Sequence, residues 1–76
     1  MNPTVGRIVH FHPSKNDPLH GRNGADFHAA IVTQVWPNGL VNLCVFPASG
    51  QAEQRTSICA TPSSDYNYWA WPPREG

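Results

Sequence analysis

Histidines are the residues of this 76-residue chain whose spacing first suggests chemistry. His10 and His12 lie two positions apart, so on a strand both side chains would point to the same face. Together with His20 or His28 they could supply three imidazoles to a zinc ion. However, the sequence has neither a Cys-x-x-Cys nor a His-Glu-x-x-His spacing. We therefore interpret the histidines as surface or ligand-facing groups, and predict no metal and no cofactor.

The serines and cysteines form no recognisable nucleophilic centre. A nucleophile needs a neighbouring base and an orienting group, and the glycine pattern of a nucleophile elbow is absent from the sequence. The acidic residues fall mostly in predicted loops or at the C-terminus, which disfavours a pair of catalytic carboxylates. We predict that the chain is not an enzyme. A nucleotide hydrolase that uses His10 or His12 is the enzymatic alternative.

One short segment, Gly21-Arg22-Asn23-Gly24, resembles a phosphate-binding loop only superficially. It lacks the complete phosphate-loop motif, and no convincing helix follows it. As a loop apex it needs no further explanation. Its functional interpretation is that Arg22 binds a phosphate or carboxylate, with glycines allowing close backbone approach.

Aromatic side chains are the richest feature, with three Trp, three Phe and two Tyr. Each tryptophan buries on the order of 150–250 Å², more in total than so small a core can hide. Trp69 and Trp71 share one face of the last predicted strand, with Tyr68 and Ala70 on the other. One set is therefore expected in the core and the other at a groove or subunit interface. The simpler alternative is that all of the aromatic residues are core or oligomer contacts.

Composition limits the partners. Five basic and five acidic residues give a net charge of +0, which argues against binding of long nucleic acid through many phosphate contacts.

No basic segment followed by an apolar run marks a signal peptide, and no stretch approaches the roughly 18 apolar residues of a membrane span. Cys44 and Cys59 are too few for a disulfide framework and are expected to be small buried hydrophobes; a disulfide is the alternative. We predict a cytoplasmic protein that binds no membrane.

The length allows one domain, residues 1–76. A chain this short buries only about 60% of its unfolded surface, so its stability margin is thin. Association of identical copies is a common way to gain the missing burial. We therefore expect a homo-oligomer.

Strand signals recur along the chain, and no segment has the periodicity of an amphipathic helix. Pro37-Asn38-Gly39 has the turn chemistry of a hairpin, and residues 13–27 form a long polar loop. The predicted strands are residues 5–12, 28–36, 40–46, 51–60 and 68–71. This layout predicts an all-β fold, a small five-stranded SH3-like barrel with a long loop after the first strand. An open meander or an OB-like barrel is the alternative.

Four blocks of the sequence resemble a family of small, largely uncharacterised proteins encoded by phages. The blocks are PTVGRIVHF (residues 3–11), AAIVTQVW (29–36), VNLCVF (41–46) and YWAWPPR (68–74). The last block departs from a Trp-His-Trp-Pro pattern, because Ala70 stands at the histidine position. The resemblance implies a phage origin and a small barrel, and supplies no established activity.

By analogy of size and origin, we predict a non-enzymatic binding protein that sequesters a nucleotide-derived signal of bacterial immunity in the host cytoplasm. An exposed aromatic ring beside an arginine suits purine stacking. The alternative is a protein-interaction module that inhibits a host protein or joins a phage assembly. Indoles would stack on the ligand, arginines (or Lys15) would bind phosphate, and neutral polar groups would read ring edges. The predicted ligand-binding residues are Arg7, His12, Arg22, His28, Trp36, Asn42, Trp69 and Trp71.

Overall fold

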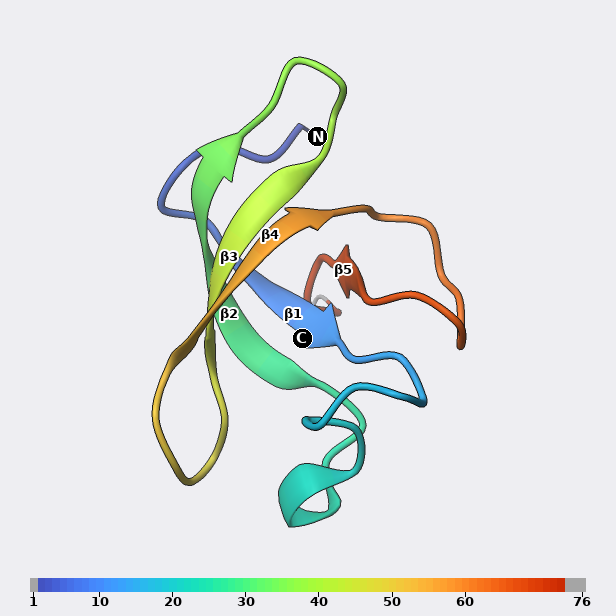
Figure 1. Ribbon diagram of the computed structural model, residues 1–76. Coiled ribbons are helices and arrows are strands. Elements are labelled where there is room, and N and C mark those ends of the chain that lie inside the picture. Colours follow the sequence, from blue (N-terminus) through green and yellow to red (C-terminus); the bar gives the residue numbers. More distant parts are fainter. Residues whose placement is uncertain (1, 74–76) are drawn as a thin grey trace.

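The computed structural model describes residues 2–73, and these form an all-β fold (Figure 1). The predicted long loop after the first strand is confirmed, and it contains one turn of 3-10 helix. The elements are β1 (Ile8–His12), η1 (Arg22–Gly24), β2 (His28–Val35), β3 (Val41–Phe46), β4 (Glu53–Ile58) and β5 (Tyr68–Ala70).

The five strands form one antiparallel sheet in the order β4-β3-β2-β1-β5. The sheet curls until its two edges approach each other (Figure 1). There, Cys59 bridges Tyr68 in parallel, and the Trp69 amide donates to the Cys59 carbonyl at 2.9 Å. The result is a curled half-barrel, consistent with the predicted small SH3-like barrel. Such curling covers edges that an open sheet would expose.

The hairpin between β2 and β3 confirms the turn predicted at residues 37–39. Gly39 has a φ of 90°, which glycine adopts without steric cost. Its amide donates to the Trp36 carbonyl at 2.9 Å, and the Asn38 side chain accepts from the Leu40 amide at 3.0 Å. Local residue chemistry therefore sets this turn and the β2–β3 pairing.

The first strand starts later than predicted, at Ile8 instead of Val5. Gly6 has a φ of 95°, and the Arg7 amide donates to the Thr4 carbonyl at 3.1 Å. A turn at residues 4–7 therefore precedes β1. The β-branched composition of the segment did not reveal it.

Strict alternation along the second strand, predicted through residue 36, is wrong at its end. Ala30 and Val32 point into the core, but the pairing with β3 shifts between Val32 and Gln34. Because of this bulge, Val35 and not Gln34 returns to the core side, where it packs against the buried cluster. A bulge adds one unpaired residue and so exchanges the faces beyond it.

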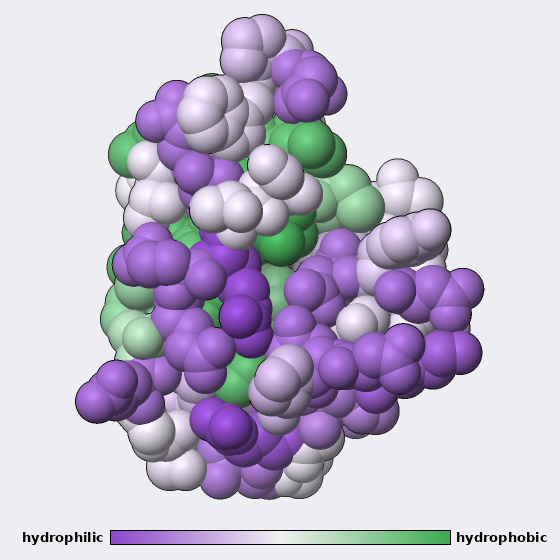
Figure 2. All heavy atoms as spheres, in the orientation of Figure 1, coloured by the Kyte–Doolittle hydropathy of each residue, from purple (hydrophilic) through white to green (hydrophobic). Residues whose placement is uncertain are grey.

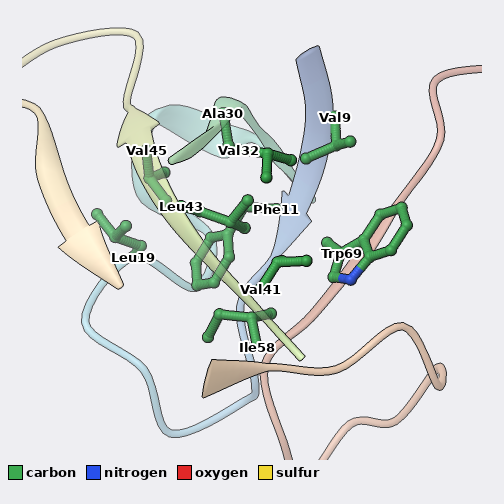
Figure 3. Packing of buried hydrophobic residues seen from close by; sticks show 10 residues of the cluster. All are labelled: Val9, Phe11, Leu19, Ala30, Val32, Val41, Leu43, Val45, Ile58 and Trp69. Atoms are coloured by element: carbon green, nitrogen blue, oxygen red, sulfur yellow. The ribbon is translucent and has the colours of Figure 1, made fainter. Parts of the chain in front are cut away.

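The core lies inside the curl of the sheet (Figure 3). Nine of its members come from the strands, and Leu19 comes from the long loop. Cys44 and Cys59 are half-buried free thiols, so the prediction of buried cysteines is wrong: Cys44 pairs across from Ile31 on the side away from the core. The core residues are Val9, Phe11, Leu19, Ala30, Val32, Val41, Leu43, Val45, Ile58 and Trp69.

Candidate functional site

The predicted ligand-binding residues do not meet at one place. Arg7 and Trp71 lie together at one corner of the barrel, with Trp69 buried behind them. His12, Trp36 and Asn42 lie on the side of the sheet that faces away from the core. Arg22 and His28 belong to neither group.

The corner formed by Arg7 and Trp71 joins a cation to an aromatic ring. The guanidinium carbon of Arg7 lies 5.4 Å from the centroid of the Trp71 ring, within the range of a cation–π interaction. Trp69 packs against Trp71 edge to face, with centroids 5.3 Å apart. Arg7 is exposed, Trp71 is half-buried and Trp69 is only 5% exposed. Trp69 therefore fixes Trp71 from the core and offers no ring face of its own to a ligand.

We call the side of the sheet that points away from the core the outer face. Strand register joins its side chains into continuous rows, such as Phe46–Ala29–His10–Ala70 across four strands. It includes Ile8, His10 and His12 of β1, Ala29, Ile31 and Gln34 of β2, Asn42, Cys44 and Phe46 of β3, Gln54 of β4, Tyr68 and Ala70 of β5, and Phe27 and Trp36 at the two ends of β2.

The strand residues of the outer face carry no formal charge at neutral pH. Glu53 and Arg55 are the charged residues of the described strands, and they pair opposite Val45 and Leu43, which are fully buried. Both therefore project to the core side of the sheet. In Figure 2, hydrophilic residues cover the lower and right-hand parts, over the long loop and the segment between β4 and β5, whereas hydrophobic residues appear along the left margin beside β2.

Four aromatic rings form a continuous row on the outer face, made of two stacked pairs and a tilted contact between them. His10 stacks on Phe27 with centroids 4.2 Å apart, and His12 stacks on Tyr68 at 4.5 Å. Phe27 and His12, at 5.4 Å, connect the two pairs. The spacing of the histidines predicted their common face. Their partners come from the end of a loop and from the last strand, so no local pattern could have revealed them.

The environment of His12 favours the neutral form of its ring. Burial, and then the neighbouring His10, lower the pKa of His12 from its ordinary value of 6.5, while Asp26 acts in the opposite direction. Desolvation disfavours the charged imidazolium. A neutral ring suits an apolar contact surface.

Trp36 and Asn42 are joined by a side-chain hydrogen bond. Asn42 Oδ1 accepts from Trp36 Nε1 at 2.9 Å and from the Ser57 amide at 2.9 Å. Ser57 has a φ of 56°, in the bulge where β3 and β4 change register. This oxygen of Asn42 is therefore engaged within the chain, whereas the Trp36 indole remains 42% exposed.

The other predicted phosphate contacts face carboxylates. Arg22 Nη1 lies 3.9 Å from a Glu53 oxygen, and Lys15 Nζ lies 3.2 Å from Asp65. An anionic ligand at either cation would have to compete with the carboxylate. Neither cation joins an exposed aromatic ring in the described contacts.

His28 does not lie on the surface, so the prediction of a surface position for it is wrong. Its side chain is buried, and Nε2 lies 3.0 Å from the Leu19 carbonyl oxygen. The contact ties the long loop to β2. It also places His28 on the core side, opposite to His10 and His12, and the residues that the structure describes contain no group of three metal-ligating side chains.

A polar network that sequence reasoning missed fixes the long loop. Asp17 accepts hydrogen bonds from Arg55 Nη2, the Leu19 amide and Asn67 Nδ2, and Asn67 Oδ1 accepts from the Ser14 amide at 2.7 Å. Arg55 also pairs with Glu53. The contacts Asp17–Arg55, Asp17–Asn67 and Asn67–Ser14 join residues 38 to 53 positions apart, beyond the range of any local signal.

The comparisons with known proteins add no assignment. No protein-family model, no curated protein and no solved structure matches the chain. No helix among residues 2–73 is long and apolar enough to span a membrane. The geometry distinguishes two candidate surfaces: a cationic aromatic corner at Arg7 and Trp71, and an outer face whose strand residues carry no formal charge.

Proposed function

We propose that this chain is a non-enzymatic binding protein that sequesters a small nucleotide-derived ligand at the Arg7–Trp71 corner. The observation that carries the proposal is the guanidinium of Arg7 lying 5.4 Å from the Trp71 ring centroid. Among the predicted site residues, this is the place where a cation and an accessible aromatic ring meet. A nucleotide needs both, because its base stacks and its phosphates require positive charge.

The interaction energies favour a ligand base over the Arg7 guanidinium as the partner of the Trp71 ring face. An exposed cation–π contact contributes about 0.5–1 kcal/mol, whereas stacking of a base on an aromatic side chain contributes about 1–3 kcal/mol. A base that takes the ring face releases the guanidinium to fork onto a phosphate. Trp69, packed edge to face on Trp71, keeps the indole in position.

The ligand class follows from this chemistry and from the resemblance to phage-encoded barrels. A nucleotide signal of bacterial immunity, met in the host cytoplasm, combines a base with phosphates. Sequestration requires binding without conversion, so ligand released by heating should have the mass of the ligand added. A changed mass would favour the hydrolase alternative.

A thermal-shift and calorimetric panel of cyclic dinucleotides and ADP-ribose derivatives tests the proposal. A ligand at about 100 times its Kd adds about 2.7 kcal/mol of stability, which raises the Tm of a domain this size by roughly 10–20 °C. Arg7→Gln should weaken binding by about 10–100-fold, through loss of a charge-assisted contact worth about 1.5–3 kcal/mol.

Arg22→Gln is the matched control, because Arg22 is also an exposed arginine but has no exposed aromatic ring among its described contacts. It should leave the affinity unchanged. No stabilisation by any member of the panel, or equal losses in the two arginine variants, would refute the proposal.

The alternative, a protein-interaction module that inhibits a host protein or joins a phage assembly, is favoured by the outer face. Ile8 is 60% exposed and Phe27 and Phe46 are each 43% exposed on a surface without charged strand residues. A nucleotide would find no phosphate partner there. An apolar protein surface fits it better.

A further inference from the structure

The corner formed by Arg7 and Trp71 is built on a turn at residues 4–7. The Arg7 amide donates to the Thr4 carbonyl at 3.1 Å, which closes the turn. Gly6 occupies the third position of the turn, with a φ of 95°. A positive φ at that position is typical of a type II turn and favours glycine, because an L side chain is strained there. The position of Arg7 therefore depends on a backbone conformation that glycine permits.

The turn is fixed to the bulge of β2 by two backbone hydrogen bonds. The Gly6 amide donates to the Val32 carbonyl at 2.8 Å, and the Val32 amide donates to the Arg7 carbonyl at 2.9 Å. The pairing of β2 with β3 changes register immediately after Val32. Bulges of this kind often lie beside functional sites, where they re-aim a side chain. Val32 therefore holds the backbone from the Gly6 amide to the Arg7 carbonyl, including the Cα from which the arginine side chain extends.

We infer that Gly6 is a positioning residue of the corner: its positive φ sets the turn that directs Arg7 to the ring face of Trp71. The inference rests on the proposed function, because it assigns Gly6 to the same ligand site. An arginine side chain has many rotamers, and a fixed Cα limits the places that its guanidinium can reach. The guanidinium found 5.4 Å from the ring centroid then loses less freedom when a phosphate binds.

The ring that Arg7 faces is held independently of the turn. Trp71 packs against the buried core cluster and lies edge to face on Trp69, with centroids 5.3 Å apart. A change at Gly6 should therefore move Arg7 and leave the indole in place. Beyond its chain neighbours, a Cβ added to Gly6 would meet no heavy atom within 4 Å in the described part of the chain. Alanine at this position thus tests the backbone conformation without a steric clash.

Gly6→Ala tests the inference, and Gly24→Ala is the matched control. Gly24 also has a positive φ, 74°, and open space around an added Cβ. It lies in η1, at the opposite end of the molecule from the N-terminal segment (Figure 1). Urea unfolding should therefore show a similar loss of stability in the two variants, because both place an L side chain at a positive φ.

The affinities should differ between the two glycine variants. They are measured by calorimetry with whichever cyclic dinucleotide or ADP-ribose derivative binds the unchanged chain. Gly6→Ala should lower the affinity by about 5–30-fold, because strain at this φ favours turn conformations that withdraw Arg7. Gly24→Ala should lower it by less than about twofold. Gly6→D-Ala, made by chemical synthesis of the chain, favours a positive φ and should restore the affinity.

Acrylamide quenching of Trp71 fluorescence reports the position of Arg7 without any ligand. The measurement uses a Trp36→Phe background, which removes the exposed indole on the outer face. Trp69, at 5% exposure, is shielded from the quencher, so the half-buried Trp71 dominates the signal. A guanidinium that leaves the ring face uncovers it and should raise the quenching constant.

This constant should rise in Gly6→Ala and in Arg7→Gln, and should stay unchanged in Gly24→Ala. Unchanged quenching in Gly6→Ala, or equal losses of affinity in the two glycine variants, would overturn the inference. A panel in which no nucleotide binds refutes the proposed function instead, and the quenching comparison then decides by itself whether Gly6 positions Arg7. The two proposals therefore fail separately.

Discussion

Replacement of Asp17 by alanine is expected to cause the largest loss of stability of any single polar substitution in the long loop. Asp17 Oδ1 accepts from Arg55 Nη2 at 3.0 Å and from the Leu19 amide at 2.9 Å, and Oδ2 accepts from Asn67 Nδ2 at 3.0 Å. Its side chain is 9% exposed and that of Arg55 is 21% exposed. One carboxylate therefore holds the long loop to β4 and to the segment before β5.

The expected cost is about 3 kcal/mol. Breaking a fully buried ion pair costs about 3–5 kcal/mol, because a buried charge is left without its partner. The cost here is at the lower end, since Arg55 is partly solvated and keeps Glu53 at 3.1 Å. A loss of about 3 kcal/mol lowers the Tm of a domain this size by roughly 12–24 °C.

Urea unfolding at pH 7, followed by tryptophan fluorescence, measures this loss against Asp65→Ala. Asp65 also pairs with a cation, Lys15, at 3.2 Å, but the two side chains are 66% and 59% exposed. Exposed pairs contribute little, so Asp65→Ala should cost less than about 0.5 kcal/mol. Similar costs for the two variants, or less than about 1 kcal/mol for Asp17→Ala, would show that burial does not govern these pairs. If Asp17→Ala fails to fold, Asp17→Asn, which keeps an acceptor, should fold with a smaller loss.

Three further predictions concern stability. His28→Ala should cost about 2–4 kcal/mol by emptying a buried site and removing the His28 contact to the Leu19 carbonyl, which keeps the Arg22 amide as its donor, and hydrogen exchange should speed up first in residues 13–27; unchanged exchange there would contradict the tether. The pKa of His12 in the folded state lies below its ordinary value of 6.5. As the pH falls from 6.5 towards that lower pKa, the unfolded state therefore binds more protons than the folded state. The free energy of unfolding should decline over this pH range. Urea midpoints between pH 7.5 and 5 should show the decline, and His12→Gln should reduce it; an equal decline in the variant would assign it to another group. Gly39→Ala should cost about 1–2 kcal/mol by chemical unfolding, because alanine is strained at a φ of 90°; a neutral result would mean that the turn adopts another conformation.

Much of the fold could be predicted because its signals are local. Pro37-Asn38-Gly39 fixes the β2–β3 turn, as its side-chain and backbone contacts show. Alternation within residues 41–46 assigns Val41, Leu43 and Val45 to the core. The polar turn composition of residues 13–27 marks the long loop. In each case the residues that cause the turn, strand or loop are neighbours in the sequence.

The candidate surfaces could not be predicted from local sequence patterns, because they depend on tertiary packing and on a β-bulge. Trp69 and Trp71 share one face of the last strand and its extension, yet only packing buried the first and left the second beside Arg7. The bulge after Val32 exchanged the faces of β2 and placed Val35 against the core. Alternation cannot foresee an inserted residue.

The β class, the turn at residues 37–39 and the common face of His10 and His12 could be inferred from the amino-acid sequence alone. The pairing of all five strands was needed to place Phe27 and Tyr68 against the two histidines, and to turn Glu53 and Arg55 inward so that the strand residues of the outer face carry no formal charge. The physical reason is that strand faces are set by period-two geometry along the chain, whereas contacts across the sheet depend on register and curvature, which arise only when all five strands pair.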